Sequence, residues 1–192
     1  MRKIVVGMFV SLDGVVEGPG SNDDFELAGW TGPYWDDAIG ETIFGSMMVS
    51  DAMLMGRTTY QSFKGAFSSA PAEDPFGSKM NSVTKYVVST TLPSADWANS
   101  ILIKDNVIEE IRKLKQQPGM DISISGSAGL VHSLMPHDLI DEYQLLYYPV
   151  VLGRGKRMFP DGLKMDLKLV ETKTFKTGVV MLRYQPADKS II

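Results

Sequence analysis

Short apolar runs alternate with amphipathic segments along the first two thirds of the chain. Residues 34–50 and 106–117 carry apolar side chains at three- and four-residue spacing, which is typical of helices that cover a sheet. The runs between them are rich in aliphatic and β-branched residues and are short enough to be buried strands. These runs are 3–10, 52–56, 85–89, 100–103 and 122–125. Strands that alternate with helices predict a largely parallel sheet.

The last third of the chain has a different pattern. Residues 139–151 form one long strand-like run, and 167–175 and 179–185 flank the turn at Lys176–Gly178. Such spacing predicts a C-terminal antiparallel hairpin. We therefore expect an α/β fold in one domain over residues 1–192, with a mixed, mostly parallel central sheet that is flanked by helices.

Several segments between these predicted elements lack a clear period in their hydrophobic residues. Residues 13–33 hold five glycines and two prolines and predict a long irregular loop, which in compact domains is often functional. Residues 57–60 are expected to open a helix that the threonines cap, and residues 130–135 to form a short helix after a tight turn. The Gly-, Pro- and Ser-rich stretch 64–81 predicts a surface excursion rather than a domain linker.

Composition narrows the function classes. The net charge of −4 and the lack of Lys/Arg clusters argue against nucleic acid as a partner. The absence of cysteine removes disulfides and thiolate chemistry and suits a reducing cytoplasm. The apolar N-terminal run is broken at Gly7 and is too short for an export signal or a membrane span. His132 and His137 lack ligands at metal-binding spacing, so we predict no metal.

Three strand-to-helix junctions carry small residues rich in hydrogen-bond donors: Gly56–Thr59, Ser89–Thr91 and Gly126–Gly129. Any one of them is more often a capped helix than a binding site. Free amides at a helix start can hold a phosphate, and an arginine can pair with it bidentately. Three such junctions in one domain favour a dinucleotide with separated phosphates, although the G-x-G-x-x-G fingerprint is absent.

Longer motifs around these junctions resemble a known family. Residues 53–63, MLMGRTTYQSF, resemble the strand–helix motif of dihydrofolate reductases. Ser11–Gly14, Asp141–Glu142, the stretch PVVLGRG at 149–155 and Phe159 are similar to the C-terminal reductase domain of the riboflavin-biosynthesis enzyme RibD. The resemblance spans nearly the whole chain and implies the three-layer dihydrofolate reductase-like fold.

The resemblance also implies NADPH as the cofactor and assigns its contacts. Arg57 would bind the adenosine 2′-phosphate, with Gly56, Thr58 and Thr59 at the pyrophosphate. Ser89 and Thr90 would lie near the adenosine phosphate. Gly126, Ser127, Ala128, Gly129 and Leu130 would run under the pyrophosphate and the nicotinamide ribose. The sequence departs from dihydrofolate reductases at this turn, where it has Ser125–Gly126 in place of their Gly-Gly pair.

Three acids are candidates for catalysis, because reduction by hydride also needs a proton. Asp37 and Glu41 lie on the predicted first helix, where dihydrofolate reductases carry a substrate-orienting carboxylate, but neither matches that position; a solvated helix surface is the alternative. Asp13 follows the first strand and either contacts substrate or hydrogen-bonds within its own turn.

Candidate substrate contacts are Val16 and Trp35 in or beside the long loop, and Arg154 after the 139–151 run. Trp30, Tyr34 and Trp35 either stack on a flat heterocycle or staple the loop to the helix. Arg154, with Lys156 and Arg157, either receives a substrate phosphate or forms an ordinary exposed turn.

These observations lead to two functional hypotheses. The first is an NADPH-dependent reductase that transfers hydride to a pterin- or pyrimidine-like molecule, in the manner of 5-amino-6-(5-phosphoribosylamino)uracil reductase or dihydrofolate reductase. The second is a non-catalytic NADP(H)-binding module with a degenerate site. The resemblance further implies a homodimer, to which the strand at 145–152 is expected to contribute.

Overall fold

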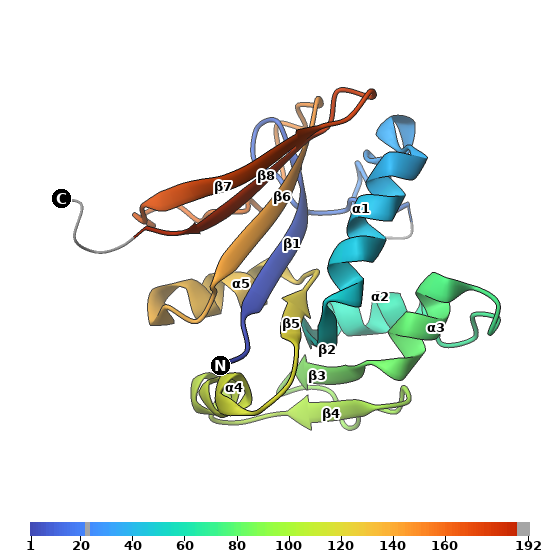
Figure 1. Ribbon diagram of the computed structural model, residues 1–192, viewed down its shortest axis with the longest axis vertical. Helices are drawn as coiled ribbons and strands as arrows, with labels where there is room; N and C mark the ends of the chain where they lie inside the picture. The colour runs from blue at the N-terminus through green and yellow to red at the C-terminus, as the bar shows by residue number, and fades with distance from the viewer. Residues whose placement is uncertain (22–23, 188–192) are drawn as a thin grey trace.

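A single eight-stranded sheet organises the computed structural model, which describes residues 1–21 and 24–187 (Figure 1). Residues 22–23 of the predicted loop and 188–192 of the predicted domain lie outside the described residues. The strands are β1 (Ile4–Ser11), β2 (Ser50–Gly56), β3 (Thr84–Val88), β4 (Ser100–Ile103), β5 (Asp121–Ile124), β6 (Glu142–Tyr148), β7 (Leu167–Thr174) and β8 (Val180–Pro186). Their spatial order is β4-β3-β2-β5-β1-β6-β8-β7. The strands from β4 to β6 are parallel, and β8 pairs antiparallel with both β6 and β7.

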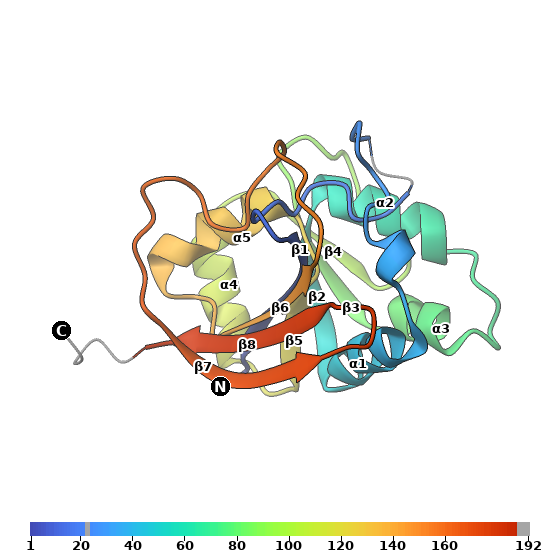
Figure 2. The same cartoon turned by 90° about the horizontal axis from the view of Figure 1, so that it is seen from above.

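Helices cover both faces of the sheet and complete three layers. They are α1 (Asp37–Met48), α2 (Arg57–Phe67), α3 (Pro75–Ser82), α4 (Val107–Gln116) and α5 (Ala128–Leu134), with 3₁₀ turns at Gly32–Tyr34 and Met135–His137. Figure 2 shows α4 and α5 on one face and α1, α2 and α3 on the other. Of the helices in the described residues, none is long and apolar enough to cross a membrane.

Side chains along β2 alternate between the two faces of the sheet, so this one strand contributes to two hydrophobic clusters. Ala52 and Leu54 pack into the cluster under α4 and α5, whereas Met53 and Met55 pack into the cluster that includes α2 and α3. Successive side chains of a strand point to opposite faces, so a run that is apolar throughout is what a strand buried on both faces requires. The predicted mostly parallel, helix-flanked sheet with its C-terminal hairpin is confirmed.

Two segments differ in local structure from what the sequence indicated. The stretch 64–81 is more than a surface excursion, because α2 continues to Phe67 and α3, with Gly77 and Met80 buried, occupies Pro75–Ser82. Pro75 stands in the first turn of α3, where its missing N–H costs nothing, and the Asp74 carboxylate accepts a 3.0 Å hydrogen bond from Phe76 N. The strand predicted at 139–151 is shorter, since β6 ends at Tyr148, directly before Pro149.

The strand from which a contribution to a dimer surface is predicted, within residues 145–152, is not an edge of the sheet. β6 lies between β1 and β8, and Leu145 and Leu146 are buried in this chain's own core. The exposed edge on this side of the sheet is β7, where Leu169 and Val170 are each 48% exposed. The homodimer itself stays a prediction.

Lys85 on β3 is a buried charge that ties α3 to the segment before β4. Its side chain is fully buried, and Nζ donates to the carbonyls of Asn81, Val83 and Ala98 at 3.2, 2.8 and 2.9 Å. The ammonium also lies 4.5 Å from the centroid of the Trp97 ring. Its three donors therefore satisfy carbonyls that helix and strand geometry leave unpaired.

We predict that Lys85→Met lowers the free energy of unfolding by about 2 kcal/mol, because it removes the Lys85 donor from the carbonyls of Val83 and Ala98, whereas Asn81 O keeps the hydrogen bond from Asn99 Nδ2. Urea denaturation with an unchanged m value would measure this loss. Lys113→Met, on the exposed surface of α4, is the matched control and should change stability by less than about 0.5 kcal/mol. Equal stability of the two variants would contradict the role given to Lys85.

Candidate functional site

The carboxyl ends of five neighbouring parallel strands meet at one edge of the sheet. In spatial order these strands are β3, β2, β5, β1 and β6. Register pairs Gly56 with Val88, Val6 with Ile124 and Ser11 with Tyr148, so the chain leaves each strand at the same edge. In open α/β sheets, ligands bind beyond the carboxyl ends of the strands. The three donor-rich junctions and the loops after β1 and β6 all begin at this edge.

Arg57 links the junction after β2 to the junction after β3. It is the first residue of α2, and its exposed guanidinium donates from Nη1 to Thr91 Oγ1 at 2.9 Å. Ser89 Oγ accepts hydrogen bonds from the backbone N–H groups of Thr91 and Leu92, which fixes the turn. Thr90 is exposed beside it. The predicted neighbours Arg57, Ser89 and Thr90 are thus brought together.

The threonines do not cap α2, which corrects the sequence-based expectation. The N-cap is Gly56, which makes no side-chain hydrogen bond, and Thr58 and Thr59 lie inside the first turn. The first amides of α2 therefore keep their donors at the edge where an anion is expected, and the helix dipole adds partial positive charge there.

The turns after β2 and β5 are in direct contact. A Cβ at Gly56 would collide with Ser127 Oγ, and a Cβ at Gly126 would lie 2.8 Å from Thr59 Oγ1. Gly126 also has a φ of +130°, which side chains rarely tolerate, and its peptide bond to Ser127 is cis. Glycine is therefore required at both turns by close approach. Ser127 occupies the N-cap position of α5 without a side-chain capping hydrogen bond, and the first residues of the helix, Ala128, Gly129 and Leu130, complete the predicted set.

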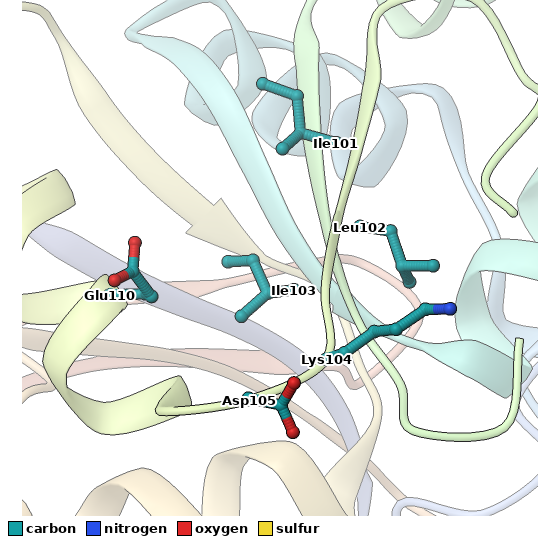
Figure 3. Close-up of a pocket in the computed structure, with 6 residues that line it drawn as sticks. All are labelled: Ile101, Leu102, Ile103, Lys104, Asp105 and Glu110. Atoms are coloured by element: carbon teal, nitrogen blue, oxygen red, sulfur yellow. The ribbon is translucent and has the colours of Figure 1, made fainter.

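A shallow groove of about 430 Å³ continues this edge beyond β3 (Figure 3). It lies along β4 and the start of α4, next to the Ser89 junction, since Ser89 N donates to Ile103 O at 3.1 Å. Its lining combines apolar and charged side chains: Ile101, Leu102, Ile103, Lys104, Asp105 and Glu110. The groove next to the Ser89 junction therefore has an apolar side, with charged side chains at its ends.

Asp13 joins the loop after β1 to the loop after β6. Its carboxylate accepts hydrogen bonds from Ser11 Oγ at 2.6 Å and from the backbone N–H groups of Leu152 and Gly153 at 3.1 and 2.8 Å. The Ser11 hydroxyl above all, with the two amides, outweighs partial burial and lowers the pKa of Asp13 to about 2. Asp13 is therefore an ionised acceptor.

The basic group after β6 binds the same long loop. Arg154 pairs with Glu26 at 2.6 Å, Lys156 lies 3.4 Å from Glu17, and Arg157 donates to Asp13 O. Val16, which is buried, donates its N–H to Lys156 O at 2.8 Å. In the described part of the chain, Arg154 and Val16 thus hold the two loops together, and their predicted contacts with a substrate remain predictions.

Aromatic side chains attach this loop to α1 and β6. Tyr148 makes edge-to-face contacts with Phe9, Trp30 and Tyr34 at centroid distances of 5.6, 5.4 and 6.1 Å. Burial, and secondarily the charge of Asp36, raises the pKa of Tyr148 to about 12. Trp30 and Tyr34 therefore hold the loop in place through Tyr148, which is the second of the two roles considered for them from the sequence. Trp35 is 50% exposed and stays available to a ligand.

The two acids predicted on the first helix lie on its surface. Asp37 and Glu41 are both exposed, and α1 starts at Asp37 because the Asp36 carboxylate caps it through Ile39 N at 2.8 Å. The structure brings neither acid to Asp13. Their proposed part in catalysis therefore gains no support from a shared site.

Sequence reasoning overlooked two residues beneath α1. A Cβ at Gly7 in β1 would have no atom within 4 Å. The register partner of Gly7 in β6 is Gln144, which is buried, and its Oε1 lies 2.9 Å from Ser46 Oγ of α1. Both carried a signal in the sequence: a glycine inside an apolar strand often marks close approach of a ligand, and a glutamine interrupts the apolar run of β6.

Comparison with known proteins places this geometry in a family. Over 189 residues the chain is 36% identical to the uncharacterized protein YyaP of Bacillus subtilis (strain 168), covering 95% of this chain and 94% of that protein. A putative riboflavin biosynthesis protein from Shewanella sp. PV-4 has a similar structure, with a TM-score of 0.69 at 18% identity, covering 97% of this chain and 100% of the other.

Dihydrofolate reductase from Enterococcus faecalis, in complex with NADP(H) and the compound RAB-propyl, shares the fold with a TM-score of 0.61 at 15% identity and 97% coverage of both chains. The sequence profile of the RibD C-terminal domain matches residues 2–181. The chain therefore belongs to the RibD C-terminal domain family, whose structural neighbours are RibD and dihydrofolate reductase-like reductases.

Proposed function

We propose that the protein is an NADPH-dependent reductase that transfers hydride to a flat, pterin- or pyrimidine-like molecule. The observation that carries the proposal is Arg57, which stands at the start of α2 with its guanidinium turned to the β3 junction. An arginine between two strand ends can pair with a 2′-phosphate, and the uncapped amides of α2 suit the adjoining pyrophosphate. The β4 groove would receive the adenine on its apolar wall.

The rest of the edge supports an extended dinucleotide. The glycine-dependent contact between the turns after β2 and β5 gives the backbone close access to a ligand. From there, the cofactor would continue past Gly126–Leu130 to the ends of β1 and β6. Its nicotinamide would supply the hydride, while these residues hold and orient it. The NADP(H) complex of the Enterococcus faecalis enzyme agrees with this cofactor class.

A non-catalytic NADP(H)-binding module is the second candidate. One observation favours it: the carboxylate of Asp13 already accepts three hydrogen bonds, and Asp37 and Glu41 are on the surface. An ionised Asp13 with a pKa of about 2 cannot donate a proton at neutral pH. In the reductase, the proton would therefore come from water, and Asp13 would act by positioning the two loops.

We predict that Arg57→Ala weakens NADPH binding by at least about tenfold and NADH binding by less than about threefold, because only NADPH carries the 2′-phosphate. Calorimetric titration of both cofactors measures this difference. Lys64→Ala, which removes another exposed cation of α2, serves as the control and should leave both affinities unchanged. An equal loss for NADPH and NADH would refute the assignment of Arg57.

A second experiment separates the reductase from the binding module. Oxidation of NADPH should be measured at 340 nm against a panel of pterins, pyrimidines and simple carbonyl compounds. The reductase predicts turnover of at least one flat heterocycle, with Arg57→Ala raising the KM for NADPH more than it lowers kcat. Tight NADPH binding without turnover of any member would favour the binding module.

We predict that Asp13→Asn lowers the free energy of unfolding by about 1 kcal/mol above pH 4, allowing for solvent screening of this partly exposed group. The native pKa of about 2 lies below the ordinary value of 3.8, so the stabilisation is complete above that value and is lost as the pH falls towards 2. Urea unfolding from pH 2 to 7 should therefore show a flatter acid limb for the variant. Asp161→Asn, an exposed change, should reproduce the wild-type limb.

A further inference from the structure

The outer strand β7 has a free edge in the described part of the sheet. It pairs with β8 on one side, and seven of its eight residues are exposed. Figures 1 and 2 both show β7 at the margin of the sheet. Leu169 and Val170, each 48% exposed, stand near the middle of this edge. A free strand edge is a template for pairing with another chain, unless its side chains oppose that pairing.

The outer side of β7 offers main-chain hydrogen-bond groups in both halves of the strand. Ala187 N donates to Asp166 O at 2.9 Å, so these two residues belong to the hydrogen-bonded pairs of the ladder with β8. Such pairs alternate along the ladder with pairs whose N–H and C=O groups point away from each other. By register, Leu167 and Thr172 belong to the second kind. Their peptide groups therefore face outward and are suited to a further strand.

The charged side chains of β7 lie on the side of the sheet that carries α1. Lys168, Glu171 and Lys173 are register partners of residues 185, 183 and 181 of β8, which alternate along the strand and so share one side. Lys173 Nζ donates to Thr42 Oγ1 of α1 at 2.8 Å, which identifies that side. The irregularity between Leu169 and Glu171 is a β-bulge, and it brings residues 168 and 171 to the same side although they are three positions apart. Asp166, opposite Ala187, continues the row.

Two copies of β7 fit together in one antiparallel register. When a two-fold axis passes through the bulge, Lys168 of each copy lies opposite Glu171 of the other, and Asp166 lies opposite Lys173. The symmetry repeats both ion pairs. The two bulges face each other on the axis, so the halves on either side stay in register, and the exposed apolar side chains of Leu169 and Val170 meet there. Opposite charges and apolar side chains across strands stabilise such a pairing.

The same charges disfavour the neighbouring registers. Because side chains alternate between faces, the register can shift only in steps of two if the same faces are to meet. One such shift places Lys168 opposite Lys173 and Glu171 opposite its own copy. The opposite shift places Lys168 opposite its own copy and Glu171 opposite Asp166. Like charges directly opposite are destabilising, so the charges of β7 select one register.

We propose that β7 is the surface on which a second copy of this chain pairs, with Lys168 opposite Glu171 and Asp166 opposite Lys173 across a two-fold axis. The two sheets then continue into each other. The strands β1, β6 and β8 separate β7 from β5, and β2 and β3 lie farther still. The pairing therefore leaves the junctions after β2, β3 and β5 open and is independent of the proposed reductase activity.

Charge reversal tests the register. Sedimentation velocity from about 1 to about 300 µM protein measures association, and the wild type should form a dimer in this range. Lys168→Glu and Glu171→Lys each place like charges opposite one another, so each should weaken dimerisation at least about tenfold. Lys113→Glu on the exposed surface of α4 changes the net charge as Lys168→Glu does and should dimerise like the wild type. A monomeric wild type, or Lys168→Glu that dimerises as tightly as the wild type, would overturn the proposal.

A mixture of the two variants separates a specific register from a general effect of charge. Lys168→Glu and Glu171→Lys in equal amounts should form a mixed dimer about as tightly as the wild type, because each altered charge then meets its opposite. Asp166→Lys mixed with Lys173→Glu repeats the test at the second ion pair, should Glu171→Lys loosen its own contact with Arg183. Mixtures that associate no more than the single variants would refute the register.

Discussion

The parallel pairing of β1 with both β5 and β6 governs where every candidate ligand contact lies. This pairing aligns the ends of β5, β1 and β6, and the pairing of β2 with β5 and β3 extends the alignment outward. Right-handed crossovers then return the chain through helices on both faces, so that each loop after a strand emerges at the same edge. This constraint brings together the turns proposed to bind phosphate and the loops proposed to bind substrate before any side chain contributes.

Once the strands are aligned, side-chain hydrogen bonds determine how the loops lie. Asp13 is central, because one carboxylate receives donors from its own turn and from the two amides after β6. The ion pairs of Glu17 and Glu26 with Lys156 and Arg154 are more exposed and contribute less. The long loop is therefore held along one side by a well-satisfied acceptor, while Trp35 near its other end remains exposed.

The residues of the proposed cofactor site could be singled out from the sequence because they depend on local backbone chemistry. Gly56 and Gly126 are needed where two turns touch, and Arg57 needs only its place at a helix start. Both requirements are met by short motifs that can be recognised in the sequence. The failure at α3 has the opposite cause: its Gly, Pro and Ser content is weakly helical, and the helix depends on the Asp74 cap and on the burial of Met80.

The pair of Gly7 and Gln144 was harder to single out from the sequence because the two residues meet only through the sheet. Gly7 and Gln144 are far apart in sequence and become neighbours by register, and the Ser46 contact requires α1 to lie across β6. Replacing Gly7 by alanine would be expected to favour a strand by about 0.5–1 kcal/mol, so the bare backbone has a cost in stability. A ligand-free packing role does not explain that cost, since no side chain fills the space. Hydride transfer depends mainly on holding two rings in contact. The exposed places of Asp37 and Glu41 on α1 are therefore compatible with the proposed reductase.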